Sequence, residues 1–319
     1  MKQPCLILIA AAALLSLAVA QQKKSSQPPK FGNPFDGRWD LTMTTPTETY
    51  PDWIMFDFTD CCMQALIQPR TGGTVWANNL QNKGTHLTFT FRDATWNLDV
   101  NGDKLTGTIK QGDTVEAKVA GARAPKLAHA EPGAWTNPEP LFNGKDLAGW
   151  EPISPADNHW VVKDGELVNE EKGSNLKTTR KFDDFKLHIE YNCPDNGNSG
   201  IFLRGRYEIQ VEYEPPEANT KYHRMGSIYS FLAPAVELPR KPGEWESFDI
   251  TLVGRWVTVV RNGAKTINQQ QILGITGGAL DSNEAAPGPI CLQGDHTGGM
   301  KYRNITISVP KPVAAKKKS

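Results

Sequence analysis

The stretch Lys186–Tyr213 decides the fold of the second half of this chain, and it reads KLHIEYNCPDNGNSGIFLRGRYEIQVEY. Apolar and polar residues alternate along Lys186–Asn192 and again along Tyr207–Tyr213, and a turn rich in Asn and Gly lies between them. Alternation with a period of two is typical of a β-strand with one buried face. The stretch therefore predicts consecutive antiparallel strands.

The polar faces of these two strands carry carboxylates and amides. The first presents His188, Glu190 and Asn192, and the second presents Glu208, Gln210 and Glu212. Alternating Glu and Gln on a strand ordinarily means a solvated outer face. The flexible segments DNGNSG and LQGDHTGG, which lie next to strands, favour instead a carbohydrate site on this polar face. Both interpretations stay open at this point.

The chain as a whole predicts an all-β protein with two domains. Its 319 residues are enough for two domains, and its 35 basic and 35 acidic residues cancel, which predicts no nucleic-acid partner. Residues 35–120 contain short alternating segments separated by Gly-containing turns, which predict a small antiparallel β-barrel or meander. Residues 141–310 show many strands and almost no helical periodicity, which predicts a two-sheet jelly-roll sandwich.

The remaining segments are predicted to be connections and an export signal. Residues 1–20 have an apolar run followed by Ala18-Val19-Ala20, which is typical of a secretory signal peptide. Residues 21–34 are predicted to be a flexible leader, residues 121–140 an Ala- and Pro-rich linker, and residues 311–319 a basic tail. The protein is therefore expected to be exported, to the periplasm or the extracellular space, and to have no membrane span.

Four cysteines remain outside the predicted signal peptide: Cys61, Cys62, Cys193 and Cys291. An oxidising compartment permits disulfides, but the spacing does not give their connectivity. A bond between the neighbours Cys61 and Cys62 would be strained, and no pair has zinc-site spacing. We interpret all four as structural.

A series of motifs in the second half resembles a known family. In order along the chain they read LFNGKDLAGW, WVVKDGELV, FDDFKLHIEY, NGNSGIFLRGRYEIQV, KPGEWESFDIT and YRNITI. Together they resemble the 3-keto-disaccharide hydrolase family over Pro140–Pro310, but the resemblance does not cover residues 35–119. It implies a concanavalin-like jelly roll with 3-keto-glucoside 1,2-lyase and 3-keto-glycal hydratase activity. It also implies a sugar substrate that a separate sugar 3-dehydrogenase has oxidised at C3.

The chemistry of such a substrate defines the catalytic groups to look for. A carbonyl at C3 acidifies the C2 proton, so a base can remove it and expel the C1 group, after which water can add back. The site needs a base, a donor for the enolate oxygen and an acid for the leaving group. By resemblance, Glu208 or Glu190 is the base, Arg204 holds the oxygen, and His296 or His223 is the acid.

Other polar positions are expected to bind the substrate: Asn198, Ser199, Gln210, His223 and Gln293. A divalent metal is compatible with the family. Glu190, Glu208 and His296 could supply oxygen and nitrogen ligands, although their spacing does not require a metal.

Two other functions fit the same fold. The segment Glu208–Glu212 has the spacing of the Glu-x-Asp-x-Glu signature of jelly-roll β-glucanases, with Gln210 in place of the central Asp. Jelly rolls also serve as lectins, so a carbohydrate-binding protein without turnover is the third reading.

Overall fold

The computed structural model describes residues 32–59, 62–77, 79–215 and 220–312. The predicted signal peptide, most of the predicted leader, Cys61 and most of the basic tail lie outside these residues. Contacts divide the chain into the units Met1–Asn33 and Pro34–Ser319, so the predicted boundary at residues 121–140 stays a prediction. Among the described residues, no helix has both the length and the apolar character needed to cross a membrane.

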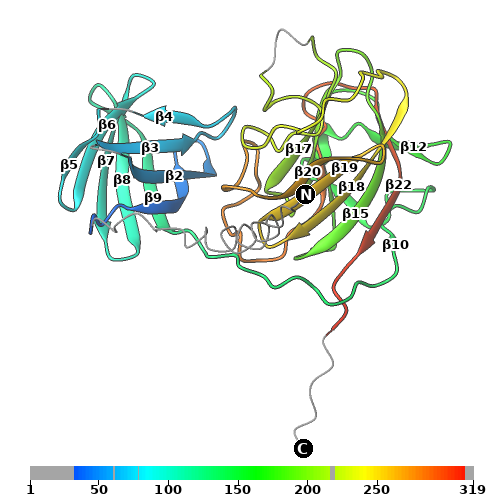
Figure 1. Ribbon diagram of the computed structural model, residues 1–319. Helices are drawn as coiled ribbons and strands as arrows, with labels where there is room; N and C mark the ends of the chain where they lie inside the picture. The colour runs from blue at the N-terminus through cyan, green and yellow to red at the C-terminus, as the bar shows by residue number, and fades with distance from the viewer. Residues whose placement is uncertain (1–31, 60–61, 78, 216–219, 313–319) are drawn as a thin grey trace, which may run out of the picture. The chain divides into compact units, whose positions relative to one another are not determined.

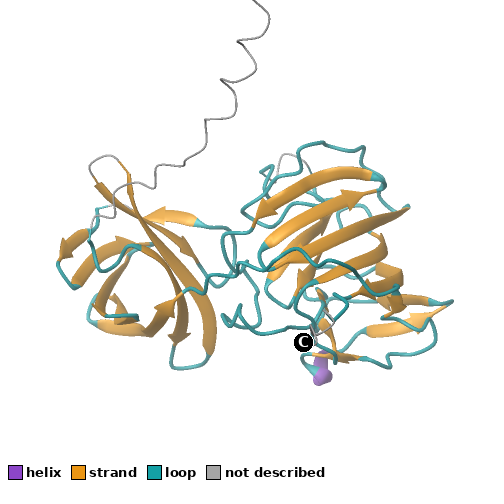
Figure 2. Cartoon of the chain, turned by 60° about the horizontal axis from the view of Figure 1, so that its bottom comes forward, coloured by secondary structure: helices purple, strands orange, loops and turns teal. Residues whose placement is uncertain are grey.

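The first half of the described chain forms one antiparallel sheet with the strand order β4-β3-β2-β1-β9-β8-β7-β6-β5 (Figure 1). The sheet curls, as Figure 2 shows, so that β4 comes close to β6. Its strands are β1 (Gly37–Thr44), β2 (Thr49–Thr59), β3 (Cys62–Gln68), β4 (Val75–Ala77), β5 (Gln81–Lys83), β6 (His86–Phe91), β7 (Ala94–Asn101), β8 (Lys104–Gln111) and β9 (Thr114–Arg123).

The inner face of the curl holds its own apolar core. On β1, the alternate residues Trp39, Leu41 and Met43 are buried, and Leu98 and Leu105 meet them from β7 and β8. The period-two pattern forces this, since successive side chains point to opposite faces. The predicted small barrel is thus confirmed as a curled half-barrel whose end strands, β4 and β5, are not paired with each other.

The second half forms two further antiparallel sheets. The eight-stranded sheet has the order β12-β13-β22-β15-β18-β19-β20, with β10 on β22, and the five-stranded sheet has the order β11-β14-β21-β16-β17. The strands are β10 (Glu139–Pro140), β11 (Trp150–Pro152), β12 (Trp160–Lys163), β13 (Glu166–Asn169), β14 (Leu176–Thr178), β15 (Phe185–Asn192), β16 (Asn198–Leu203), β17 (Tyr207–Glu212), β18 (Trp245–Val253), β19 (Trp256–Arg261), β20 (Ala264–Gln271), β21 (Cys291–Leu292) and β22 (Met300–Ser308). A single turn of 3-10 helix, Pro155–Asp157, follows β11.

The two sheets enclose one core, which confirms the predicted all-β jelly-roll class. Leu187 and Ile189 of β15 enter it from the eight-stranded sheet, and Ile201 and Ile209 enter it from the five-stranded sheet. Because side chains alternate along a strand, the residues between them face outward, away from the core. Each sheet therefore has an outer face of its own.

Two of the cysteines are buried thiols without a disulfide partner, Cys193 and Cys291. Burial raises the pKa of each thiol to about 12, so neither is a reactive thiolate at neutral pH. This agrees with the structural role predicted for them.

Candidate functional site

The candidate site lies on the outer face of the five-stranded sheet, where β16 and β17 pair. All six residues of β17 are buried. The residues on the core face are expected to be buried, but burial of the residues on the outer face is unusual. The cause is a loop that lies along the edge of β17. Gln210 N donates to Ser227 O at 3.0 Å, Gly226 N donates to Gln210 O at 2.8 Å, and Tyr229 N donates to Glu208 O at 3.0 Å.

Glu208 is the carboxylate at the centre of this face. It is 4 % exposed, and no hydrogen bond from the described residues acts on its carboxylate. Burial raises its pKa well above the ordinary value, and the negative charge of Asp295 raises it further. The carboxylate lies against the backbone of β16, since a Cβ added to Gly200 would lie 2.2 Å from Glu208 Oε1. A carboxylate held in this way is a stronger base than a solvated one.

Amide side chains surround the carboxylate. Gln210 Nε2 donates to Asn198 Oδ1 at 3.2 Å, and Asn198 Nδ2 donates to Glu214 Oε1 at 2.8 Å. The Oε1 atoms of Gln210 and Gln293 are buried, and neither has a hydrogen-bond partner within the described residues. Buried polar atoms are nearly always paired in proteins, so these two acceptors indicate a ligand that donates hydrogen bonds.

A tyrosine and a histidine from the covering loop complete the cluster. Burial raises the pKa of Tyr229, and the charges of Glu208 and Glu214 raise it further, so its hydroxyl stays protonated. The ring of His223 stacks on Tyr229 with 4.5 Å between centroids, and burial lowers the pKa of this histidine. Tyr229 was missed in the sequence because it lies in an irregular segment without periodicity, where only the loop's pairing with β17 reveals its position.

Glu190 lies elsewhere, on the outer face of the eight-stranded sheet. It accepts hydrogen bonds from Arg303 Nε and Asn304 Nδ2, each at 2.7 Å. Burial acts to raise its pKa, but these hydrogen bonds and the charge of Arg303 hold it below the ordinary value. Glu190 and Glu208 belong to sheets whose core faces meet, so they point in opposite directions. The expected convergence of these two carboxylates is not found.

Arg204 and Ser199 are also turned away from the site. Arg204 is fully buried and donates to Asp183 Oδ1 at 2.9 Å, and to Tyr207 Oη and Gly254 O at 3.0 Å each. Ser199 is on the core side of β16, where its hydroxyl donates to Gln293 O at 2.7 Å. Because Arg204 is fully buried and three groups hold its guanidinium there, its predicted enolate-binding role has no geometry to support it.

His296 remains near the site but is exposed. Its Nδ1 lies 2.7 Å from Oδ1 of Asp295, the residue whose charge acts on Glu208. The predicted residues that the structure gathers around Glu208 are thus Asn198, Gln210, His223 and Gln293, with His296 at the margin.

The expected metal ligands are not gathered, because Glu190 lies on the other sheet. The group with suitable donor atoms among the described residues is His129, Asp183 and Asp184, whose atoms lie within 4.8 Å of one another. These donors already have partners: His129 Nδ1 lies 2.8 Å from Asp184 Oδ1, Gly254 N donates to that same oxygen at 2.7 Å, and Asp183 holds Arg204. We assign no metal to this group.

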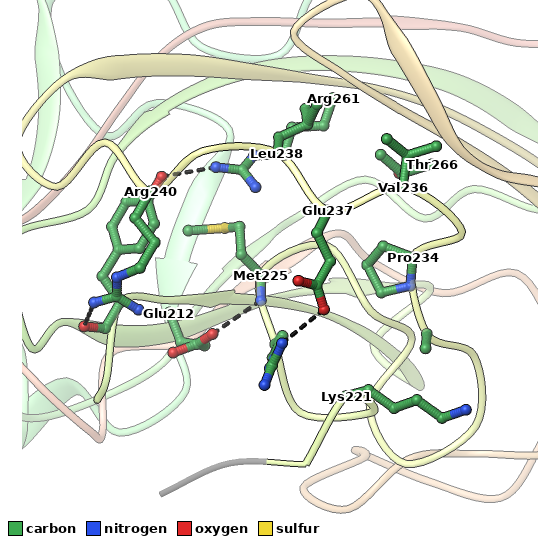
Figure 3. Close-up of a pocket in the computed structure, with 13 residues that line it drawn as sticks. Glu212, Lys221, Met225, Pro234, Val236, Glu237, Leu238, Arg240, Arg261 and Thr266 are labelled. Atoms are coloured by element: carbon green, nitrogen blue, oxygen red, sulfur yellow. Dashed lines mark hydrogen bonds and ion pairs between the residues drawn. The ribbon is translucent and has the colours of Figure 1, made fainter. Parts of the chain in front are cut away.

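A hollow of about 270 Å³ opens at the far end of β17, beside Glu212 (Figure 3). Glu212 lies on the same face of β17 as Glu208. Its Oε1 accepts a hydrogen bond from Met225 N at 3.0 Å, and its Oε2 accepts one from Glu214 N at 2.8 Å. These bonds direct the Glu212 carboxylate to the loop backbone. Two of the basic side chains around the hollow are engaged as well, since Arg224 pairs with Glu237 and Arg261 pairs with Glu246.

Comparison with known proteins finds a family match for the second half of the chain. The family model described as a 3-keto-alpha-glucoside-1,2-lyase-like domain matches residues 137–308. A search of curated proteins gave no match. One crystal structure of a glycosyl hydrolase candidate from Parabacteroides distasonis is 33 % identical, covers 57 % of this chain and 93 % of its own, and has a TM-score of 0.47. Another from the same organism is 21 % identical, covers 56 % and 94 %, and has a TM-score of 0.44.

Proposed function

Because the chain belongs to the 3-keto-alpha-glucoside-1,2-lyase-like family, we propose that it cleaves 3-keto-glycosides by eliminating the group attached at C1. The substrate class follows from the family, and a sugar 3-dehydrogenase must supply it, because the C2 proton of an unoxidised sugar is not acidic. Addition of water to the resulting enone would make the net reaction a hydrolysis.

Glu208 acts as the base in this proposal. Its carboxylate takes the C2 proton, the electrons of the C2–H bond form the C1–C2 double bond, and the C1–O bond breaks. The carbonyl at C3 carries the negative charge while this occurs. The amide Nε2 of Gln293 is a donor for that oxygen or for the sugar hydroxyls on the same face, and so is the second N–H of Gln210 Nε2, whose first hydrogen goes to Asn198 Oδ1.

Tyr229 acts as the acid that protonates the departing oxygen. Its raised pKa keeps the proton on the hydroxyl, and it lies close enough to Glu208 for their charges to interact. His223, stacked on Tyr229, orients the ring. This assignment replaces Arg204 and Glu190, which the structure places elsewhere, and leaves His296 without a direct catalytic role.

One observation carries the proposal. Glu208 is a buried carboxylate on which burial and the charge of Asp295 act, with no hydrogen bond to it from the described residues. The buried Oε1 atoms of Gln210 and Gln293, on the same face, have no partner among those residues either. On a solvated outer face the carboxylate and the amide oxygens would be exposed to water. A buried carboxylate with a purely structural role would be paired with a hydrogen-bond donor. These unpaired acceptors can receive hydrogen bonds from the hydroxyl groups of a sugar.

The test compares a 3-keto-glucoside with its unoxidised parent and follows release of the C1 group. We expect release from the keto sugar alone, and Glu208→Gln should lower kcat by roughly 10²–10⁴-fold, as for the loss of a general base. Glu190→Gln is the matched control and should keep full activity. Release from the parent sugar would indicate a glucanase, and binding without release would indicate a lectin.

A retaining β-glucanase is less well supported by the geometry. That chemistry needs two carboxyl groups about 5–5.5 Å apart. The Glu212 carboxylate is bound by two backbone amides of the covering loop, at the far end of β17 from Glu208. The pair therefore lacks the second free carboxylate.

We also propose that the protein is exported, on the strength of the N-terminal signal-peptide pattern. Fractionation of expressing cells tests this, with the mature chain expected outside the cytoplasm and shortened at its N-terminus.

A further inference from the structure

A second hollow lies within the half-barrel and has no part in the proposed elimination. It measures about 240 Å³ and opens from the inner face of the curled sheet. Met43, Ile67, Trp96 and Ile109, all members of the half-barrel core, form its floor. Small β-barrels commonly enclose a ligand cavity at this place, since their inner face is apolar and their mouth is open.

One polar group interrupts this apolar lining. Asp52 lies on β2 between Tyr50 and Ile54, at an inward position where the strand pattern calls for an apolar residue. It is 3 % exposed, it lines the hollow, and its Oδ1 has no hydrogen-bond partner among the described residues. The charge of Arg92 acts on this carboxyl group, but one of its oxygens is buried without a hydrogen-bond partner among the described residues. Such burial is costly, and its presence in a well-packed barrel therefore needs an explanation.

The surroundings of Asp52 restrict what could bind there. Arg70 and Arg92 lie at the rim of the hollow, so a cationic ligand would be repelled before it reached Asp52. An anionic ligand would in turn lose its hydration against the apolar floor of the hollow. The neighbouring rings are aromatic, and Phe91 meets Trp96 edge to face with 6.3 Å between centroids. A neutral aromatic molecule with one hydrogen-bond donor satisfies all three conditions.

We propose that the half-barrel binds a small aromatic alcohol, a phenol with a short apolar substituent, whose hydroxyl donates to Asp52 Oδ1 while its ring packs against Trp96 and Ile109. This site is independent of the elimination at Glu208. It gives the first half of the chain a ligand-binding role that the family match over residues 137–308 does not include.

The experiment is calorimetric titration of the full mature chain with 4-ethylphenol and with 4-ethylanisole, in which a methyl group replaces the hydroxyl proton. The phenol should bind roughly tenfold more tightly, as expected for one hydrogen bond to a buried carboxyl group. Asp52→Leu, which has a similar volume and no acceptor, should bind both ligands with equal affinity. Ala94→Phe, which fills the hollow from β7, should bind neither.

Three controls make the result decisive. Circular dichroism and the melting temperature show whether each variant is folded, and Asp52→Asn replaces Asp52→Leu if the latter is not, with a reduced preference expected. Glu208→Gln should bind both ligands as the parent does, which separates this site from the elimination. The proposal is overturned if the parent binds neither ligand, if Asp52→Leu keeps the tenfold preference, or if Ala94→Phe leaves binding unchanged.

Discussion

At the scale of single residues, the environment of Glu208 supports the role of base that we propose for it. Glu190 and Glu208 are the same residue type on strands of similar pattern, yet the pKa of one lies below and that of the other well above the ordinary value. Glu190 has two strong hydrogen-bond donors, whereas Glu208 has burial and a negative neighbour. Only the second combination makes a carboxylate both available and strongly basic.

This contrast predicts a shift in the pH profile of the reaction. A base must be ionised, so kcat should rise with pH through the raised pKa of Glu208. Asp295→Asn removes the negative charge that raises this pKa, so the acidic limb of the profile should move to lower pH. A profile of kcat against pH for the parent and the variant measures this.

Asp249→Asn is the matched control, since Asp249 lies on β18 beside His188, on the sheet that carries Glu190. Its profile should coincide with that of the parent. If the acidic limb of the Asp295→Asn profile stayed at the same pH as that of the parent, ionisation of Glu208 would not be the cause of that limb.

At the scale of elements, the site depends on how β16 and β17 pair. Gly200 and Gln210 are partners in this register, and the Glu208 side chain lies over the glycine because no Cβ occupies that space. The covering loop then pairs with the edge of β17 and brings Tyr229 and His223 to the same face. Neither element makes the site alone.

Gly200→Ala should therefore damage catalysis more than folding. The added Cβ would lie 2.2 Å from Glu208 Oε1 and 2.8 Å from its Cγ, so the carboxylate must move aside. A displacement of about 1 Å at a catalytic group commonly lowers kcat about 10²-fold, and we expect a loss of that order with a melting temperature within a few degrees of the parent. Steady-state kinetics and a thermal melt measure the two quantities.

The control is Gly133→Ala, because an added Cβ there meets no atom within 4 Å. It should have the activity and stability of the parent. Full activity in Gly200→Ala would mean that Glu208 does not need to lie against β16.

At the scale of the whole molecule, the described residues include two buried acidic groups whose burial opposes folding, Asp52 in the half-barrel and Glu208 in the sandwich. Burial raises the pKa of both well above the ordinary value. A group whose pKa is raised on folding is protonated in the folded chain at a pH where the unfolded chain has lost that proton. Stability therefore falls as pH rises from the unfolded pKa towards the folded one.

Glu208→Gln should accordingly raise stability at neutral pH by on the order of 1–3 kcal/mol, and its advantage should shrink as the pH falls towards the ordinary carboxyl pKa. Glu190→Gln should do the opposite, because Glu190 is stabilised in its ionised form in the folded chain. Denaturant unfolding of both variants and the parent from about pH 4 to pH 8 measures this. Equal stability of the parent and Glu208→Gln at every pH would contradict the buried, unpaired state of Glu208.

Much of the architecture follows from the sequence by itself. The region 35–120, in which short alternating segments predicted strands, holds the strands Gly37–Thr44, Cys62–Gln68 and His86–Phe91, because period-two alternation and Gly-containing turns are local properties. The family was also readable, since its motifs occur in order, and the match over residues 137–308 confirms it. The prediction that Glu208 and Gln210 are site residues likewise comes from the alternation along their strand.

Only the tertiary structure decided which polar residues share a site. Sequence spacing gives the face of a strand, but it does not give the sheet that the strand joins, so Glu190 and Glu208 looked equivalent until β15 and β17 were found in different sheets. The same limit hid Tyr229, which reaches the site through an irregular loop, and Asp52, whose isolation depends on the curl of a whole sheet. The pattern within a strand is fixed by neighbours in the chain, whereas the grouping of side chains into a site is fixed by pairings between distant segments.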